Sequence, residues 1–130
     1  MIVVDASALV KVVLQEQGWE EVPTEPHVAT LDYALVEGMN AIWKAVRRGE
    51  LTIEQGKVKV VVLKTLGSSI TLFEAQNFFE RGLEIALREN ITIYDALYIA
   101  LAEALNADFL TADEKQYLAA KNYVKAMLVE

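Results

Sequence analysis

Four carboxylate side chains are the residues of this sequence best suited to act together in chemistry. They are spread along the chain: Asp5, Asp95 and Asp113 each lie near one end of an expected strand or helix, and Glu37 lies about two turns into an expected helix. In one pocket they would repel by about 4 kcal/mol per pair at 4 Å with an effective dielectric constant near 20. Such a pocket is tolerable only if some carboxylates are protonated or if cations bind. Hard divalent ions suit it, because Mg²⁺ takes oxygen ligands and leaves positions for water and substrate phosphate.

The chemistry that fits such a site is hydrolysis of a phosphodiester bond. A divalent metal lowers the pKa of a bound water and neutralises charge that builds on the phosphate. Two hydroxyl side chains, Ser7 and Thr111, each lie two residues before or after one of the acids and are placed to orient that water or phosphate. Asn40 follows Glu37 by about one helical turn, where its amide can hydrogen-bond within the same site.

The segment from Thr92 to Asp113 is the element on which this arrangement depends. It predicts a helix that is apolar on nearly every face, followed by a short strand at residues 109–111. Such a helix should be buried. Asp95 lies in its first turn, and a buried carboxylate must be hydrogen-bonded or given a cation because an unpaired buried charge is very costly.

The rest of the chain predicts strands that alternate with helices. Strands are expected at 2–4, 70–72, 109–111 and 126–129, and helices at 7–14, 30–48, 52–66, 71–88 and 114–121, with a loop over 15–27. The helix at 52–66 is supported by a capping box of Thr52 with Gln55, although its β-branched residues also suit a strand. This alternation predicts an α/β fold with a mostly parallel sheet covered on both faces.

A parallel sheet can bring acids that are far apart in the sequence to one edge of the fold. Ligands of such folds bind at the carboxyl ends of the strands, and the crossover helices start near that edge. Asp5 and Asp113 follow expected strands, and Asp95 starts the helix before one of them. Glu37 lies beside a strip of small residues, where its helix can approach the sheet edge closely.

Each acid also has a purely structural explanation. Asp95 can complete a capping box with Thr92. Asp5 and Asp113 can cap the helices that follow them. Glu37 taken alone would be an exposed helical residue. The expected convergence of the four side chains is therefore what favours a site.

Other polar and aromatic residues are assigned to the surface or the core. Asp32, Asp108 and His27 are expected at the surface, and Tyr94 and Tyr98 in the core. A basic flank for phosphates is conceivable, but a solvated helix face is the simpler account of the residues that would form it, Lys11, Lys44, Arg47 and Arg48.

Composition narrows the class of protein. The chain of 130 residues has a net charge of −7 and no cysteine, which argues against nucleic-acid binding by bulk electrostatics and against a disulfide framework. Its length suits one domain spanning residues 1–130. No apolar run is long enough for a membrane span and no secretory signal is evident, so a soluble cytoplasmic protein is expected.

Three stretches closely resemble the PIN-domain ribonucleases, and in particular the VapC toxins of toxin–antitoxin pairs. They are Val3–Lys11, Leu35–Thr52 and Tyr94–Leu105 followed by Leu110–Asp113. The similarity covers nearly the whole chain in the order of the family, which makes the combination far more specific than any one motif.

The resemblance implies a three-layer α/β/α sandwich with a central parallel sheet and a Mg²⁺- or Mn²⁺-dependent endoribonuclease site. The acidic positions of the family fall on Asp5, Glu37, Asp95 and Asp113, its hydroxyl positions on Ser7 and Thr111, and its asparagine on Asn40. It also implies an RNA substrate, a cognate antitoxin and a homodimer.

Alternatives of other classes make different demands on the sequence. A receiver-like signalling module wants two adjacent acids after the first strand, whereas Ala6 follows Asp5. A phosphatase of the haloacid-dehalogenase type wants a second Asp at position 7, where this chain has Ser. A catalytically inactive PIN-fold module that only binds a partner remains as a further alternative.

Overall fold

Residues 1–130 are described by a computed structural model with a five-stranded sheet at its centre. All neighbouring strands are parallel, in the order β3-β2-β1-β4-β5. The strands are β1 (Ile2–Val4), β2 (Val28–Leu31), β3 (Thr71–Phe73), β4 (Asp108–Thr111) and β5 (Ala126–Leu128). The chain therefore starts near the middle of the sheet, and β1 pairs with both β2 and β4.

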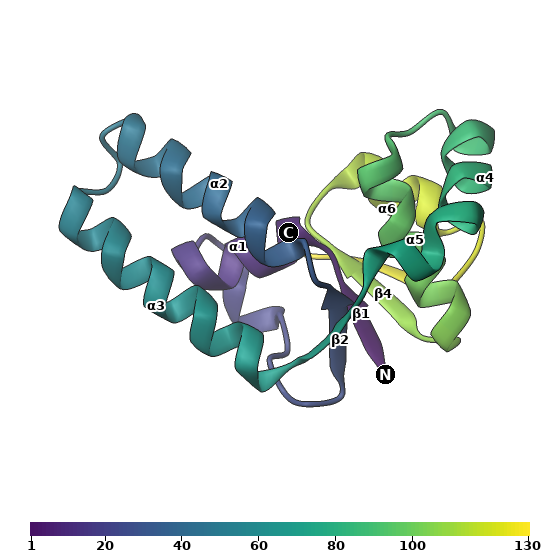
Figure 1. Cartoon of the computed structure of the whole chain (residues 1–130), viewed down its shortest axis with the longest axis horizontal. Helices are drawn as coiled ribbons and strands as arrows, with labels where there is room; N and C mark the ends of the chain where they lie inside the picture. The colour runs from purple at the N-terminus through teal and green to yellow at the C-terminus, as the bar shows by residue number, and fades with distance from the viewer.

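The helices form a layer on each side of the sheet. They are α1 (Ala6–Leu14), α2 (Ala34–Arg47), α3 (Ile53–Ser69), α4 (Phe79–Glu89), α5 (Ile93–Leu105) and α6 (Glu114–Ala120), with short 3₁₀ turns at Trp19–Glu21 and Ala75–Phe78. Figure 1 shows α1 to α3 on one side and α4 to α6 on the other. Right-handed crossovers produce this division, because the chain moves toward β3 first and then back toward β5. The predicted α/β/α sandwich is confirmed.

Helix α5 is the buried element that the sequence indicated. Its residues from Ala96 to Ala102 are all buried, and they face the sheet on one side and α4 on the other. Gly82 of α4 permits the close contact, since a Cβ there would lie 2.6 Å from a methyl group of Leu97. The apolar pattern on every face of α5 thus reflects covering layers on both sides.

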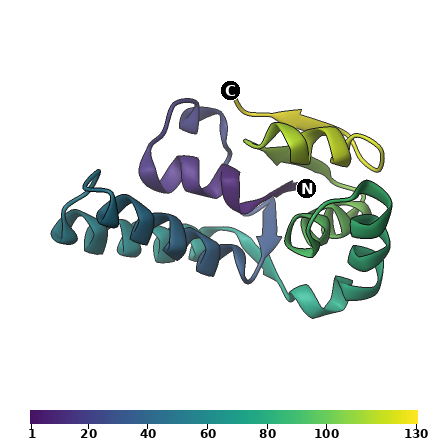
Figure 2. The ribbon, with the colours of Figure 1, turned by 90° about the horizontal axis from the view of Figure 1, so that it is seen from above.

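Helices α2 and α3 form a long hairpin that projects from the sheet (Figure 2). The capping box at its turn is complete: Thr52 Oγ1 accepts from the Gln55 amide and Gln55 Oε1 accepts from the Thr52 amide. Gly56 packs against Val46, where a Cβ would come within 2.7 Å. This packing against α2 decides for helix over strand despite the β-branched residues of α3.

Two sequence predictions of elements are wrong. Residues 28–31 form β2, although the sequence suggested a loop followed by a helix from Thr30. All four β2 residues are buried, so the strand lacks the alternation that distinguishes strands from helices. The helix expected over 71–88 begins only at Phe79, because Thr71–Phe73 pairs with β2 as an edge strand.

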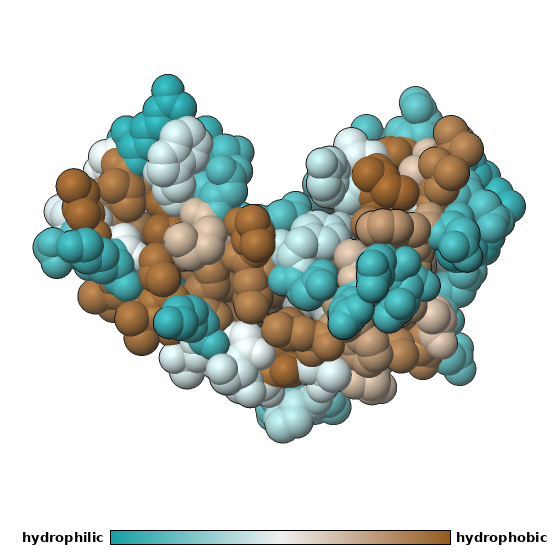
Figure 3. Space-filling view, in the orientation of Figure 1, coloured by the Kyte–Doolittle hydropathy of each residue, from teal (hydrophilic) through white to brown (hydrophobic).

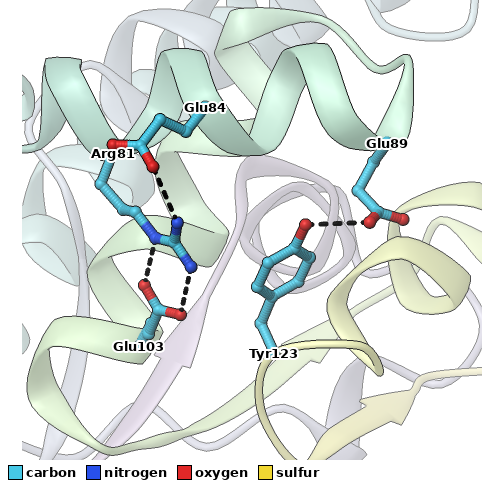
Figure 4. A network of polar contacts seen from close by, with 5 residues as sticks. All are labelled: Arg81, Glu84, Glu89, Glu103 and Tyr123. Atoms are coloured by element: carbon cyan, nitrogen blue, oxygen red, sulfur yellow. Dashed lines mark hydrogen bonds and ion pairs between the residues drawn. The ribbon is translucent and has the colours of Figure 1, made fainter.

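Polar contacts hold α4 on α5. Arg81 of α4 makes a bidentate contact with Glu103 of α5, at 2.7 and 2.9 Å, and also reaches Glu84 (Figure 4). Tyr123 donates to Glu89 at the end of α4.

None of the helices combines the length and the apolar character that a membrane span would need.

Candidate functional site

The carboxyl ends of β1 and β4 lie side by side and bring two of the predicted residues together. Val4 is in register with Leu110, so Asp5 and Thr111 come next on the two strands. Asp95 lies in the first turn of α5, and Glu37 lies in the first turn of α2 rather than two turns in, because the helix begins at Ala34. The edge of the sheet thus collects residues from four elements.

Asp5 is the most buried of the acids, with 4% of its surface exposed. Its Oδ1 accepts hydrogen bonds from Ser7 Oγ at 2.6 Å and from the Ala8 amide at 3.1 Å, and its Oδ2 accepts from Thr111 Oγ1 at 2.6 Å. Asp5 therefore caps α1, the structural role that the sequence allowed it. Burial raises the pKa of Asp5 to about 6 even though these hydrogen bonds lower it.

Ser7 and Thr111 connect the two strand ends. Their hydroxyl oxygens are 3.1 Å apart, and Ser7 Oγ accepts from the Ala112 amide. Thr111 Oγ1 in turn accepts from the Asp113 amide. The two hydroxyls fix the orientation of the Asp5 carboxylate and leave it little freedom to rotate.

Glu37 is held by a residue that the sequence assigned only to the core. Tyr98 Oη donates to Glu37 Oε1 at 2.6 Å, and Tyr98 itself is 1% exposed. Burial raises the pKa of Glu37, the hydrogen bond from Tyr98 lowers it, and the charge of Asp95 raises it. The sequence showed only that Tyr98 lies on the apolar side of its helix. Tyr94, which the sequence also placed in the core, is 61% exposed, so the prediction for Tyr94 is wrong.

Asp95 is the charge that couples the other acids. Burial raises its pKa and the charge of Asp113 raises it further, whereas Thr92 and Lys115 lower it. Asp95 in turn raises the pKa of both Asp5 and Glu37. Thr92 Oγ1 accepts from the Asp95 amide and caps α5.

Asp113 lies at the exposed rim and caps α6. Its Oδ1 accepts from the amides of Lys115 at 2.8 Å and Gln116 at 3.3 Å. Gln116, which the sequence did not mark, is 1% exposed and donates from Nε2 to the Asp95 carbonyl. Its Oε1 is buried without a partner, so a spare acceptor lies in this region.

The donor set fits a hard divalent cation held partly by water. No Lys, Arg or His forms an ion pair with any of the four acids; the ion pairs of the chain involve other carboxylates. No three acidic, histidine or cysteine side chains already form a group that could hold a metal. Mg²⁺ suits this arrangement, since it usually binds through one or two carboxylates and keeps several waters.

A groove of about 700 Å³ adjoins the acids between α1 and α2. Ser7 and Glu37 line it, and it continues past Asn40 to Lys11 and Lys44. Asn40 is exposed and faces this groove, and no hydrogen bond connects it to Glu37. Figure 3 shows a deep hollow in the surface between the α2–α3 hairpin and the lobe of α4 to α6.

Comparison with known families decides the membership of this chain. The family model for the PIN domain matches residues 2–122. The chain belongs to the PIN-domain family. Among PIN-domain relatives it is 30% identical to Ribonuclease VapC3 of Pyrobaculum aerophilum, over 88% of this chain and 90% of that protein. It is 35% identical to Ribonuclease VapC9 of Mycobacterium tuberculosis, over 87% of this chain and 86% of that protein.

Solved structures of PIN-domain proteins share the fold. A crystal structure from Pyrobaculum aerophilum is 27% identical, with a TM-score of 0.74 over 95% of this chain and 89% of that one. VapBC2 of Rickettsia felis, bound to a promoter DNA fragment, is 16% identical with a TM-score of 0.66 over the whole of both chains. The resemblance to PIN-domain proteins of the VapC type is confirmed, and it leaves no place for a receiver module or a haloacid-dehalogenase phosphatase.

Proposed function

We propose that this PIN-domain protein is a metal-dependent endoribonuclease that hydrolyses phosphodiester bonds of RNA. The observation that carries the proposal is a set of three carboxylates that form no ion pair and have raised pKa values: Asp5 after β1, Glu37 in the first turn of α2 and Asp95 in the first turn of α5. Acids in a hollow of the surface whose pKa values are raised by burial and by a neighbouring charge are typical of functional sites. The names of the VapC relatives, which are ribonucleases, support the same activity.

Four residues would hold the Mg²⁺ or Mn²⁺ ion: Asp5, Glu37, Asp95 and Asp113. When bound, such an ion supplies Lewis acidity, which activates water and offsets charge on the phosphate. Ser7 and Thr111 keep the Asp5 carboxylate in one orientation through two 2.6 Å hydrogen bonds. Tyr98 occupies Oε1 of Glu37, so Glu37 has its other oxygen free for a cation.

The test compares two acids of the same chain. Asp95→Asn should reduce Mn²⁺-stimulated cleavage of a labelled RNA by about 100-fold or more, because removal of one electrostatic stabiliser commonly costs that much. Asp32→Asn is the control, since Asp32 is exposed. Mn²⁺ binding is measured separately by titration calorimetry. Cleavage by Asp95→Asn at the native rate would overturn the proposal, and Mn²⁺ binding without any cleavage by the native chain would indicate an inactive binding module.

We further propose that the chain is the toxin of a toxin–antitoxin pair and acts in the cytoplasm. The VapC names of its relatives support this role. Expression of the native chain should arrest growth of a bacterial host, and Asp95→Asn should not. Co-expression of a small protein encoded in the neighbouring reading frame should restore growth; failure of every neighbouring product to do so would contradict an antitoxin partner.

A homodimer is also part of the proposal. Helix α4 exposes an apolar stripe at Phe79, Leu83 and Leu87, which are 53%, 55% and 75% exposed. These residues recur every four positions and therefore lie on one side of the helix. Leu87→Glu should convert a dimer to a monomer in light scattering after size exclusion. A native chain that is monomeric would exclude this part of the proposal.

A further inference from the structure

We propose that the exposed side of α2, from Asn40 to Arg47, binds the phosphate backbone of the RNA strand next to the bond that is cut. This inference rests on the proposed ribonuclease function and adds the path of the substrate. Its basis is a contrast of charge between the α2–α3 hairpin and the rest of the molecule, together with a groove that joins the hairpin to the acids.

The hairpin is basic within an acidic chain. Residues 34–69 carry three of the 19 acids and six of the 12 Lys and Arg residues, namely Lys44, Arg47, Arg48, Lys57, Lys59 and Lys64. Their net charge of +3 leaves −10 for the other residues of a chain with net charge −7. The net negative charge of the whole chain, which argued against nucleic-acid binding, therefore does not apply to this hairpin. The hairpin begins beside the acids, since Glu37 lies in the first turn of α2.

The spacing on α2 extends the site along the helix. Glu37, Asn40 and Lys44 differ by three and four residues, so they lie on one side of the helix. All three line the same groove as Ser7. Lys44 lies roughly 10 Å along the helix axis from Glu37, given a rise of 1.5 Å per residue. A strand whose scissile phosphate lies at the acids would pass Asn40 and then Lys44.

The cations of α2 are available for a ligand. Lys44, Arg47 and Arg48 are exposed and take part in no ion pair, whereas Arg81 is engaged by two carboxylates. The guanidinium of Arg47 lies 5.1 Å from the ring centre of Trp43, and Trp43 is 52% exposed. Exposed aromatic rings beside cations suit single-stranded nucleic acid, since bases stack on the ring while the cations contact phosphates.

A protein partner is the competing occupant, because Val36 and Met39 on this helix are also exposed. The free cations and the continuity with the acids favour RNA. The two occupants differ in salt dependence: each phosphate contact on a single strand contributes about 0.7 to the slope of log affinity against log salt.

The experiment measures binding of a labelled single-stranded RNA of about 12 nucleotides. Fluorescence anisotropy is recorded in EDTA, which prevents metal-dependent cleavage, over about 50 to 200 mM KCl. The double variant Lys44→Gln/Arg47→Gln should bind more weakly, with a salt slope shallower by about 1.4. The matched control Lys121→Gln/Lys125→Gln makes the same charge change at exposed positions outside the hairpin and should keep the native slope. Trp43→Ala should weaken binding about fivefold or more with an unchanged slope, because stacking is not ionic.

Several outcomes would overturn the inference. They are an unchanged slope in the α2 variant, an equal change in the control, and no RNA binding by the native chain at the lowest salt. Thermal unfolding at the native temperature shows that each variant is folded. Binding is measured without cleavage. If the native chain cuts RNA but the α2 variant has the native salt slope, only this inference is contradicted. If the native chain binds RNA through α2 but does not cut it, only the proposed ribonuclease activity is contradicted.

Discussion

Two groups of acids in this molecule have the same side-chain chemistry and opposite electrostatic environments. On α4 and α5, Glu84 and Glu103 contact the Arg81 guanidinium, which lowers the pKa of Glu103 (Figure 4). At the end of β1 and the start of α5, burial raises the pKa of Asp5 and Asp95, and neither forms an ion pair. The first group joins α4 to α5. In the second group, burial of ionised carboxylates without an ion pair lowers the free energy of unfolding.

The cost can be put in numbers for Asp5. Its pKa lies near 6, whereas that of an aspartate in water is 3.8. At about 1.4 kcal/mol per pKa unit, ionised Asp5 reduces the free energy of unfolding by about 3 kcal/mol at neutral pH. A chain that retains such a residue gains something other than stability, and binding of a divalent cation is the gain that we propose.

The largest expected effect is on catalysis. Asp5→Asn should lower the rate of Mn²⁺-dependent RNA cleavage by about 1000-fold, because it removes a proposed ligand from the centre of the site. Glu103→Gln, a change of the same kind in the paired group, should leave the rate within about twofold. The measurement is cleavage of labelled RNA under single-turnover conditions. Equal losses in the two variants would end the distinction between the groups.

The next effect is on stability and has the opposite direction from the loss of activity. In EDTA at pH 7.5, Asp5→Asn should raise the free energy of unfolding by up to about 3 kcal/mol. Because the folded-state pKa of Asp5 is raised, its stabilising contribution is complete below pH 3.8 and is lost as the pH rises through about 6. Urea denaturation of native chain and variant across this range measures the difference, and parallel pH profiles would contradict it.

A smaller effect is expected at Tyr98. Tyr98→Phe leaves Glu37 Oε1 without its donor and should cost about 1 to 2 kcal/mol of stability. It should also weaken Mn²⁺ binding about tenfold or more, because partners that orient ligating carboxylates matter for metal affinity. Tyr94→Phe is the control, since Tyr94 is 61% exposed. Calorimetric titration with Mn²⁺ that gave native affinity for Tyr98→Phe would exclude a positioning role.

The smallest effect is expected in the paired group. Arg81→Met should reduce the free energy of unfolding by about 1 kcal/mol or less, because both Arg81 and Glu103 are about a third exposed and solvent screens the pair. The contribution of Glu103 is present above its unfolded-state pKa and is lost as the pH falls, since its folded-state pKa is lowered. Urea denaturation should therefore show a pH dependence opposite in sign to that of Asp5. RNA cleavage should not change.

Several of the residues that the sequence singled out lie close together in the structure. The structure brings Asp5, Ser7 and Thr111 into one hydrogen-bonded group, and Asp95 couples electrostatically to Asp5, Glu37 and Asp113. Their role in holding a metal stays a prediction, as does the single domain over residues 1–130. No pattern in the sequence indicated that Tyr98 donates to Glu37, or that Gln116 donates to the Asp95 carbonyl.

The sequence by itself determined the alternation of strands and helices, the buried character of α5 and the capping box of α3, because these depend on residues within one or two turns of each other. Only the tertiary structure decided that residues 28–31 are a strand, since their burial comes from elements that cover them on both sides. It also decided the contacts of Tyr98 with Glu37 and of Thr111 with Asp5, which join residues 61 and 106 positions apart. Such contacts depend on how strands pair and helices cross, and no local pattern encodes that geometry.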